Sequence, residues 1–162
     1  MALVYIGLGS NEGDSCRNIQ NAWKKMAEAG FGVLLGLSAP YKSEPVGVDT
    51  ENWFVNAVGV IETRLAPEAL LVKMLAIEKE LGRDRSKGVD RCIDLDMLYY
   101  DDLVLMTPQL VLPHPGIQDR LFVLLPLAEL APDHIHPVLG KSTSMMRKGL
   151  VSGKIVQKTT WD

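Results

Sequence analysis

The residues best suited to chemistry are two aspartates at the start of an apolar stretch. Asp94 and Asp96 are followed by Met, Leu and Tyr residues, which is typical of a strand. Residues i and i+2 of a strand face the same side, ~6.6–6.8 Å apart along its axis. Two carboxylates on one face raise each other's pKa unless a cation neutralises them, and Mg²⁺ binds such carboxylates together with substrate phosphates. The pair predicts a site where two ions ~3.5–4 Å apart could clamp a phosphoryl transfer.

A cationic loop lies directly before these aspartates. It has a local charge of +2 in a chain whose formal net charge is −3. Its cations and anions are Arg83, Arg85, Lys87 and Arg91 against Asp84 and Asp90. Arginine binds phosphate oxygens well, in bidentate contacts where the geometry allows. The alternative is a solvated loop followed by two carboxylates on an exposed strand face, but the arginines and the apolar strand together favour phosphate binding.

Two glycine motifs carry weaker signals. Gly7-Leu8-Gly9-Ser10-Asn11 is similar to a dinucleotide fingerprint, but Gly13 comes one position late for that motif. A turn at the end of a strand explains it as well. Gly140-Lys141-Ser142 resembles the end of a phosphate-binding loop, but Ile135 stands where the first glycine is needed, so we reject that interpretation.

The three histidines are ambiguous from sequence. His134 and His136 alternate and could bind a metal, but no third ligand is evident and a polar loop is the better interpretation. His114 lies in the turn Pro113-His114-Pro115-Gly116, where it either serves a ligand or caps the turn.

Composition indicates one ordinary globular domain spanning residues 1–162. Apolar residues make up 47% of the chain and charged residues 23%, which excludes disorder and collagen. A mildly acidic chain is a poor nucleic-acid binder. Neither a signal peptide nor a spanning segment is visible, and Cys16 and Cys92 are isolated, so we expect a cytoplasmic protein with no membrane partner.

Hydrophobic periodicity predicts the elements that position these residues. Strands are expected over 3–8, 32–37, 53–63 and 91–100, and helices over 14–29 and 67–81. Residues 41–52 are expected to form a loop, 103–106 a short pairing segment, and 116–130 a partly helical region limited by Pro126. The order βαββαβ predicts an α+β, ferredoxin-like sandwich with additional C-terminal elements.

Taken together, the motifs resemble those of the 6-hydroxymethyl-7,8-dihydropterin pyrophosphokinase family, over about residues 4–132. The similar segments are Gly-Leu-Gly-Ser-Asn, Ser38-x-x-Tyr41-x-Ser43-x-Pro45-x-Gly47, Phe54-x-Asn56, Ile77-Glu78, Gly82-Arg83, Arg91-x-x-Asp94-Leu95-Asp96-Met97-Leu98, Pro113-His114-Pro115 and Arg120-x-Phe122. The resemblance implies transfer of pyrophosphate from ATP to the pterin hydroxymethyl oxygen with release of AMP. It also implies two Mg²⁺ ions and a mobile catalytic loop.

The resemblance also implies roles for individual residues. Asp94 and Asp96 would hold the metal ions, and Arg83 and Arg91 would stabilise charge on the transferred group. The ATP site would contain Glu78, Arg85, His114 and Arg120. The pterin pocket would contain Ser43, Val46, Phe54, Asn56 and Phe122, with the two phenylalanines on either side of the ring. We expect the chain to act as a monomer on ATP and 6-hydroxymethyl-7,8-dihydropterin.

Two residues depart from the family pattern. The loop before Arg91 is short and ends in Gly88-Val89-Asp90, where relatives commonly carry a Trp and a Gly-Pro pair, so we expect the charge of Asp90 to weaken ATP binding. Glu44 occupies a position that is often apolar.

Two other classes of function stay open. One is a ferredoxin-like module that binds a small ligand without ATP turnover, and the other is a different Mg²⁺-dependent kinase. The nucleotide product distinguishes them. A dinucleotide oxidoreductase is disfavoured, because the chain has no repeated parallel βαβ units.

Overall fold

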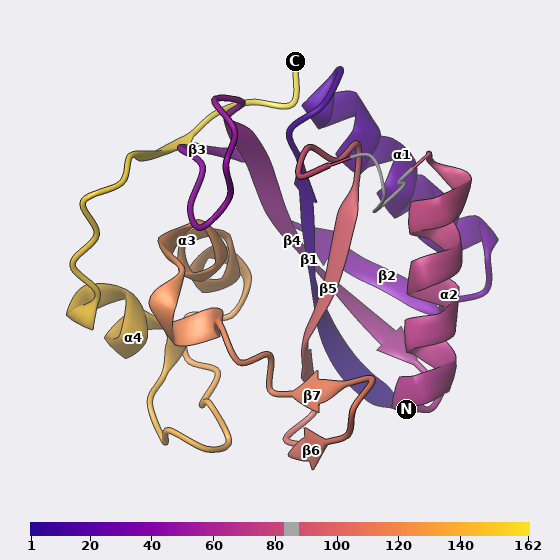
Figure 1. Cartoon of the computed structure of the whole chain (residues 1–162). Coiled ribbons are helices and arrows are strands. Elements are labelled where there is room, and N and C mark those ends of the chain that lie inside the picture. Colours follow the sequence, from indigo (N-terminus) through magenta and orange to yellow (C-terminus); the bar gives the residue numbers. More distant parts are fainter. Residues whose placement is uncertain (83–87) are drawn as a thin grey trace.

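A twisted sheet between two layers of helices forms the body of the protein (Figure 1). The structure is a computed structural model that describes residues 1–82 and 88–162. The strands of the main sheet are β1 (Ala2–Ser10), β2 (Val33–Leu37), β3 (Tyr41–Ser43), β4 (Phe54–Thr63), β5 (Asp94–Tyr100) and β8 (Val156–Lys158). All their pairings are antiparallel, so the fold is a mixed α/β structure on an antiparallel sheet.

The register of the central strands brings three separate segments together at one end of the sheet. β1 lies between β4 and β5. Gly9 of β1 is opposite Asn56 on one side and Asp94 on the other. Gly7 is opposite Asp96 in the same way. The N-terminal glycine motif therefore lies beside Asn56, Asp94 and Asp96, which are candidate site residues from the sequence.

Helices α1 (Ser15–Glu28) and α2 (Pro67–Glu80) cover one face of the sheet (Figure 1). Asp14 caps α1, since its Oδ1 accepts a hydrogen bond of 3.1 Å from the backbone N–H of Arg17. Proline occupies the first position of α2, where its missing N–H costs nothing. The buried side chains of each helix recur at helical spacing: Ile19, Ala22 and Met26 in α1, and Leu70, Met74 and Ile77 in α2.

The other face packs against α3 (Leu121–Leu130) and α4 (Thr143–Gly149). A 3-10 turn, η2 (Ile117–Asp119), leads into α3. Pro126 lies inside α3 and is buried, so the helix continues past the residue that was expected to limit it. The ring of Tyr99, from β5, packs against that of His134 at a centroid distance of 4.3 Å.

Two local expectations needed correction, and a third is confirmed. The region expected to be a loop from residue 41 begins with strand β3, which pairs with β4 and with β8 near the C-terminus. The fourth expected strand starts at Asp94 rather than Arg91. The short pairing segment expected at 103–106 is confirmed: it contains β6 (Leu105–Met106), which pairs with β7 (Val111–Leu112) in a separate two-stranded sheet.

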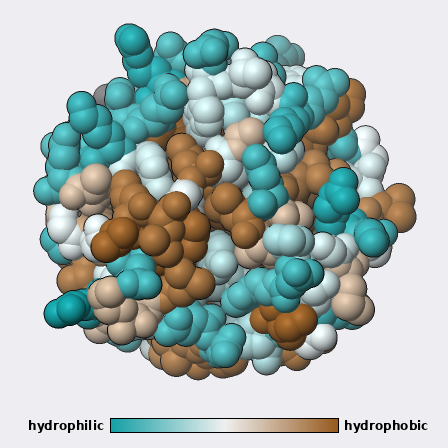
Figure 2. Space-filling view, turned by 180° about the vertical axis from the view of Figure 1, so that it is seen from behind, coloured by the Kyte–Doolittle hydropathy of each residue, from teal (hydrophilic) through white to brown (hydrophobic). Residues whose placement is uncertain are grey.

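The rear of the molecule has a mixed surface. Figure 2 shows hydrophobic side chains there in patches that are interrupted by polar ones. Across the described residues, we find no helix with the length and apolar character that a membrane crossing requires.

Candidate functional site

A cavity of about 240 Å³ opens at the end of the sheet where Gly9 lies between Asn56 and Asp94. Its walls come from β1, the end of β3, the β3–β4 connection, the start of β4, β5 and the start of α3. Nine residues selected from the sequence line it: Ser43, Val46, Phe54, Asn56, Arg91, Asp94, Asp96, Arg120 and Phe122. Residues as distant in sequence as Ser43 and Phe122 thus share one small volume.

Two aromatic rings and two guanidinium groups line part of the cavity. The guanidinium carbon of Arg91 lies 5.8 Å from the ring centroid of Phe54, and that of Arg120 lies 6.0 Å from the centroid of Phe122. Distances within about 6 Å permit cation–π attraction. Gly116 leaves room for Arg120, since a Cβ there would come within 2.7 Å of the arginine Nε. Rings held next to cations suit a flat, electron-rich ligand.

An amide and a hydroxyl form the polar edge of this part. The Nδ2 of Asn56 donates a hydrogen bond of 3.0 Å to the Oγ of Ser43. The glycine at position 9 allows this arrangement, because a Cβ there would lie 2.8 Å from the Oδ1 of Asn56. The glycine motif at residues 7–11 therefore leaves space for the side-chain amide of Asn56.

The carboxylates of β5, Asp94 and Asp96, line the same cavity. The Oδ2 of Asp94 forms an ion pair with the Nη1 of Arg91 at 3.0 Å, and both side chains are about one-fifth exposed. The side chain of Asp96 is 41% exposed. Oxygen donors on an accessible strand end fit a hard cation such as Mg²⁺. Within residues 1–82 and 88–162, there is no group of three or more His, Cys, Asp or Glu side chains that could hold a metal ion.

His114 lies beside Asp96 without lining the cavity. Its Nδ1 accepts a hydrogen bond of 3.1 Å from the backbone N–H of Gly116. Burial lowers the pKa of His114, the charge of Arg120 lowers it further, and Asp94 acts in the opposite direction. A neutral ring that accepts at Nδ1 carries its proton on Nε2, which lies 3.8 Å from the Oδ1 of Asp96.

Glu78 has an unexpected position. It is buried in α2, and its Oε2 accepts a hydrogen bond of 2.7 Å from the backbone N–H of Leu95. It does not line the cavity. Leu95 lies between Asp94 and Asp96, so this hydrogen bond fixes the backbone of β5 at the point that carries both carboxylates. Arg83, Arg85 and Lys87 lie outside the described residues.

Sequence reasoning missed a cluster of polar side chains at the rim. Asp90 accepts hydrogen bonds from Asn11, Thr50 and Asn52. These donors come from the end of β1 and from the β3–β4 connection. Nothing in the local sequence indicates this cluster, since its members lie 38 to 79 positions from Asp90.

The fold and the cavity together are typical of a nucleotide-dependent transferase. A slot with aromatic walls faces a pair of strand carboxylates with an arginine between them, on an antiparallel sheet covered by helices. The sequence model described as 7,8-dihydro-6-hydroxymethylpterin-pyrophosphokinase matches residues 5–132. The chain belongs to this family.

Similar proteins with this name have comparable lengths. The 2-amino-4-hydroxy-6-hydroxymethyldihydropteridine pyrophosphokinase of Aquifex aeolicus is 42% identical over 142 residues, which cover 87% of this chain and 88% of that protein. The protein of the same name from Methylorubrum extorquens is 41% identical over 134 residues, covering 82% and 85%.

Other similar proteins are much longer. The folic acid synthesis protein fol1 of Pneumocystis carinii is 41% identical over 154 residues, and this chain spans only 20% of its length. Among solved structures, the Plasmodium falciparum HPPK-DHPS A437G with SDX-DHP matches with a TM-score of 0.75 and 16% identity. That match covers 91% of this chain and 45% of the other, and it supports the fold alone.

Proposed function

We propose that this chain transfers the pyrophosphoryl group of ATP to the hydroxymethyl oxygen of 6-hydroxymethyl-7,8-dihydropterin and releases AMP, a reaction of folate biosynthesis. The observation that carries the proposal is one cavity lined both by Phe54, Phe122 and Asn56 and by Asp94 and Asp96. The first set suits a flat heterocycle with an amide edge, and the second suits a metal-bound polyphosphate. The names of relatives about 40% identical support the same assignment.

In this proposal the pterin lies between Phe54 and Phe122. Asn56 would pair with its amide edge, oriented by the hydrogen bond to Ser43. Val46, which is 48% exposed, would close the slot from the β3–β4 connection. Arg91 lies next to the ring of Phe54 and Arg120 lies next to the ring of Phe122, and these cations would favour an electron-rich ring between the two phenylalanines.

The polyphosphate would lie at the other part of the cavity. Asp94 and Asp96 would hold two Mg²⁺ ions, which supply neutralisation of phosphate charge and orientation when bound. Arg91 would stabilise the transferred group, with Arg83 and Arg85 acting from the loop before it. Arg120 and His114 would contact the nucleotide, and His114 would keep its Nε2 proton near Asp96. Glu78 would act on the ATP site through the backbone of Leu95.

The chemical step needs positioning more than covalent help. The hydroxymethyl oxygen would form a bond to the β-phosphorus while the bond from that phosphorus to the α,β-bridging oxygen breaks, and AMP leaves with the bridging oxygen. The proton of the hydroxymethyl group passes to water. The ion pair of Arg91 with Asp94 keeps the guanidinium at the edge of the carboxylate pair, where negative charge is transferred.

Further features of the chain fit this assignment. We propose that the core is a ferredoxin-like βαββαβ sandwich, which the neighbour order β5-β1-β4, with β2 also on β4, supports. A single domain over 1–162 is supported by a sheet that joins strands from residue 2 to residue 158. We also propose a monomer, and a cytoplasmic location that suits the free thiols of Cys16 and Cys92.

Product analysis tests the function directly. Purified protein would be incubated with ATP, Mg²⁺ and 6-hydroxymethyl-7,8-dihydropterin, and the nucleotides would be identified by chromatography and mass. AMP with pterin pyrophosphate is the expected result. Loss of both in Asp94→Ala and Asp96→Ala, with activity kept in the exposed control Asp102→Ala, would assign the metal site. ADP would indicate a different kinase, and pterin binding without turnover would indicate a binding module.

A further inference from the structure

The rim cluster around Asp90 links the two parts of the cavity. We propose that Asp90 is a positioning residue that couples pterin binding to nucleotide binding. It does so by fastening the β3–β4 connection to the backbone that carries Arg91. The coupling between the two substrates rests on the proposed function, whereas the attachment of the β3–β4 connection by hydrogen bonds to Asp90 does not.

The carboxylate of Asp90 accepts hydrogen bonds from three side-chain donors. Its Oδ1 accepts hydrogen bonds from the Nδ2 of Asn11 at 2.8 Å and from the Oγ1 of Thr50 at 2.7 Å. Its Oδ2 accepts one from the Nδ2 of Asn52 at 3.0 Å. Hydrogen bonds to an ionised acceptor are roughly twice as strong as those between neutral groups. One side chain therefore joins the end of β1, the β3–β4 connection and the segment before β5.

Asn11 extends this link to Arg91. It is buried, with 5% exposure, and its Oδ1 accepts a hydrogen bond of 2.7 Å from the backbone N–H of Arg91. Its own backbone N–H donates to the carbonyl oxygen of Arg91 at 3.0 Å. The position of the Arg91 backbone is thus set by the same asparagine that binds Asp90.

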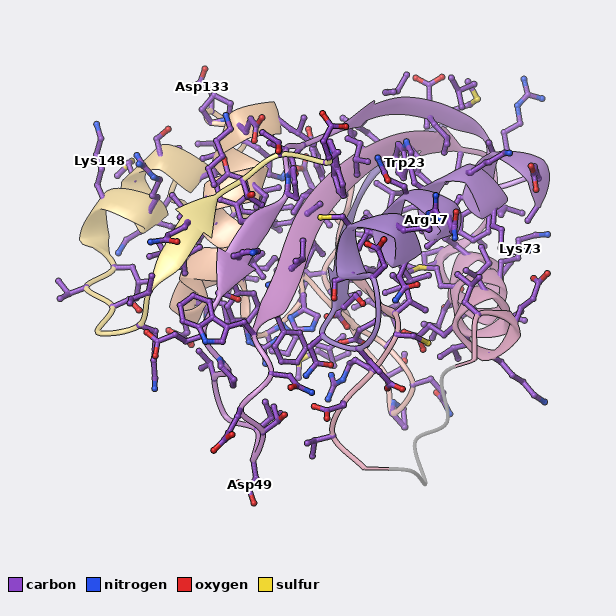
Figure 3. The ribbon with its side chains drawn as sticks, turned by 90° about the horizontal axis from the view of Figure 1, so that it is seen from above. Arg17, Trp23, Asp49, Lys73, Asp133 and Lys148 are labelled. Atoms are coloured by element: carbon purple, nitrogen blue, oxygen red, sulfur yellow. The ribbon has the colours of Figure 1, made fainter. Side chains whose placement is uncertain are left out.

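The other end of the link is the connection that closes the pterin slot. Val46, Gly47 and Val48 line the cavity, and Thr50 and Asn52 follow them toward β4. Figure 3 shows this connection projecting from the body, with Asp49 at its tip. It also shows the chain before β5 running beside it at the same end of the sheet. A connection held at its second half loses less entropy when a ligand orders the first half.

These contacts give Asp90 a structural role beside its charge. Three neutral donors hold the carboxylate in place without cancelling its charge, so Asp90 combines a structural link with its electrostatic effect on ATP. Movement of the connection toward a bound pterin would be transmitted through Asp90 and Asn11 to Arg91. By linkage, each substrate should then tighten the binding of the other by the same factor.

The test uses the isosteric variant Asp90→Asn with Asp49→Asn as its matched control. Asparagine offers one acceptor oxygen instead of two and turns its amide toward Asn52. Asp49→Asn removes the same charge from the tip of the same connection. For each protein, the pterin Kd would be measured by calorimetry with and without Mg²⁺ and a non-hydrolysable ATP analogue. We expect Asp90→Asn to raise the pterin Kd roughly tenfold and to abolish the tightening by the analogue, in line with the loss of a charge-assisted contact.

A second variant and a second measurement separate the link from general damage. Thr50→Val removes one donor at nearly constant shape and should show a smaller effect that does not add to that of Asp90→Asn. Hydrogen exchange over residues 44–53 should speed up in both variants but not in Asp49→Asn.

The proposal is overturned if Asp90→Asn affects pterin binding and exchange no more than Asp49→Asn does. It is also overturned if only the Tm falls while the tightening by the analogue persists. Faster exchange in Asp90→Asn, in a protein whose wild type makes no AMP, would keep the fastening and reject the coupling together with the proposed function.

Discussion

At the scale of single residues, the site depends on where side chains are missing as much as on where they are present. Position 9 lies between Asn56 and Asp94. A glycine is needed there because a methyl group would meet the amide oxygen of Asn56. Gly116 gives the guanidinium of Arg120 the same kind of space. Neither glycine has the positive φ that would require glycine for backbone reasons. Their role is to leave volume for functional side chains.

Gly9→Ala should therefore damage pterin binding more than stability. The new Cβ would lie 2.8 Å from the Oδ1 of Asn56 and displace the amide from its bond with Ser43. We expect the KM for the pterin to rise by about tenfold, the cost of one well-placed hydrogen bond in a buried site, with little change in Tm. Steady-state kinetics and thermal unfolding measure the two effects. Gly153→Ala, at a position with open space, serves as the control, and an unchanged pterin KM in Gly9→Ala would contradict this explanation.

At the scale of elements, the C-terminal strand supports the pterin slot. β8 pairs with β3, and Ser43 lies opposite Val156. Glu44, for which the sequence suggested no role, fastens this strand: its Oε1 accepts a hydrogen bond of 2.7 Å from the backbone N–H of Ile155. Its own backbone N–H donates to the carbonyl oxygen of Ile155 at 3.1 Å. The chain end thus contacts the segment that enters the cavity.

Glu44→Ala should lower the Tm by about 2–4 °C, which corresponds to about 1 kcal/mol in a chain of this size. It should also speed hydrogen exchange in β8, because the side-chain contact that holds Ile155 is lost. Differential scanning calorimetry and exchange mass spectrometry would measure both. Glu51→Ala, an exposed glutamate of the same connection, is the matched control. Equal effects of the two changes would mean that the contact with Ile155 contributes nothing.

At the scale of the whole molecule, two hydrophobic clusters share one sheet. One packs between the sheet and α1 and α2, and the other lies on the side of α3 and α4. Tyr41 joins β3 to α3 on the second side, because its hydroxyl donates a hydrogen bond of 2.9 Å to the Oε2 of Glu129. Burial first, and then Glu129, raise the pKa of Tyr41 to about 12.

This shift predicts a loss of stability in alkali. The unfolded chain releases the Tyr41 proton near pH 10, whereas the folded chain keeps it to about pH 12, so the contribution is complete below pH 10 and falls between these values. The Tm should decrease above pH 10 in the wild type and less steeply in Tyr41→Phe. Calorimetry from pH 8 to pH 11.5 would show it. Parallel curves for the two proteins would exclude Tyr41 as a source of the alkaline loss.

Local patterns in the sequence determined much of this protein. Periodicity predicted the main helices and the strands that form the centre of the sheet, because apolar residues at helical or alternating spacing must be buried on one face. The alternation of a strand also predicted that Asp94 and Asp96 share a side, and both line the cavity. Arg91 was selected from the cationic loop, and the family resemblance added Ser43, Val46, Phe54, Asn56, Arg120 and Phe122.

The tertiary structure alone decided which distant segments meet. Strand β3 exists because β4 and β8 supply its hydrogen-bond partners, and nothing in Tyr41–Ser43 specifies them. The burial of Glu78 against Leu95 and the three donors of Asp90 likewise depend on how the elements pack. Backbone propensities and side-chain periods act over a few residues. The hydrogen bonds of Glu78 and Asp90 join positions 17 to 79 apart, which only the packed chain brings together.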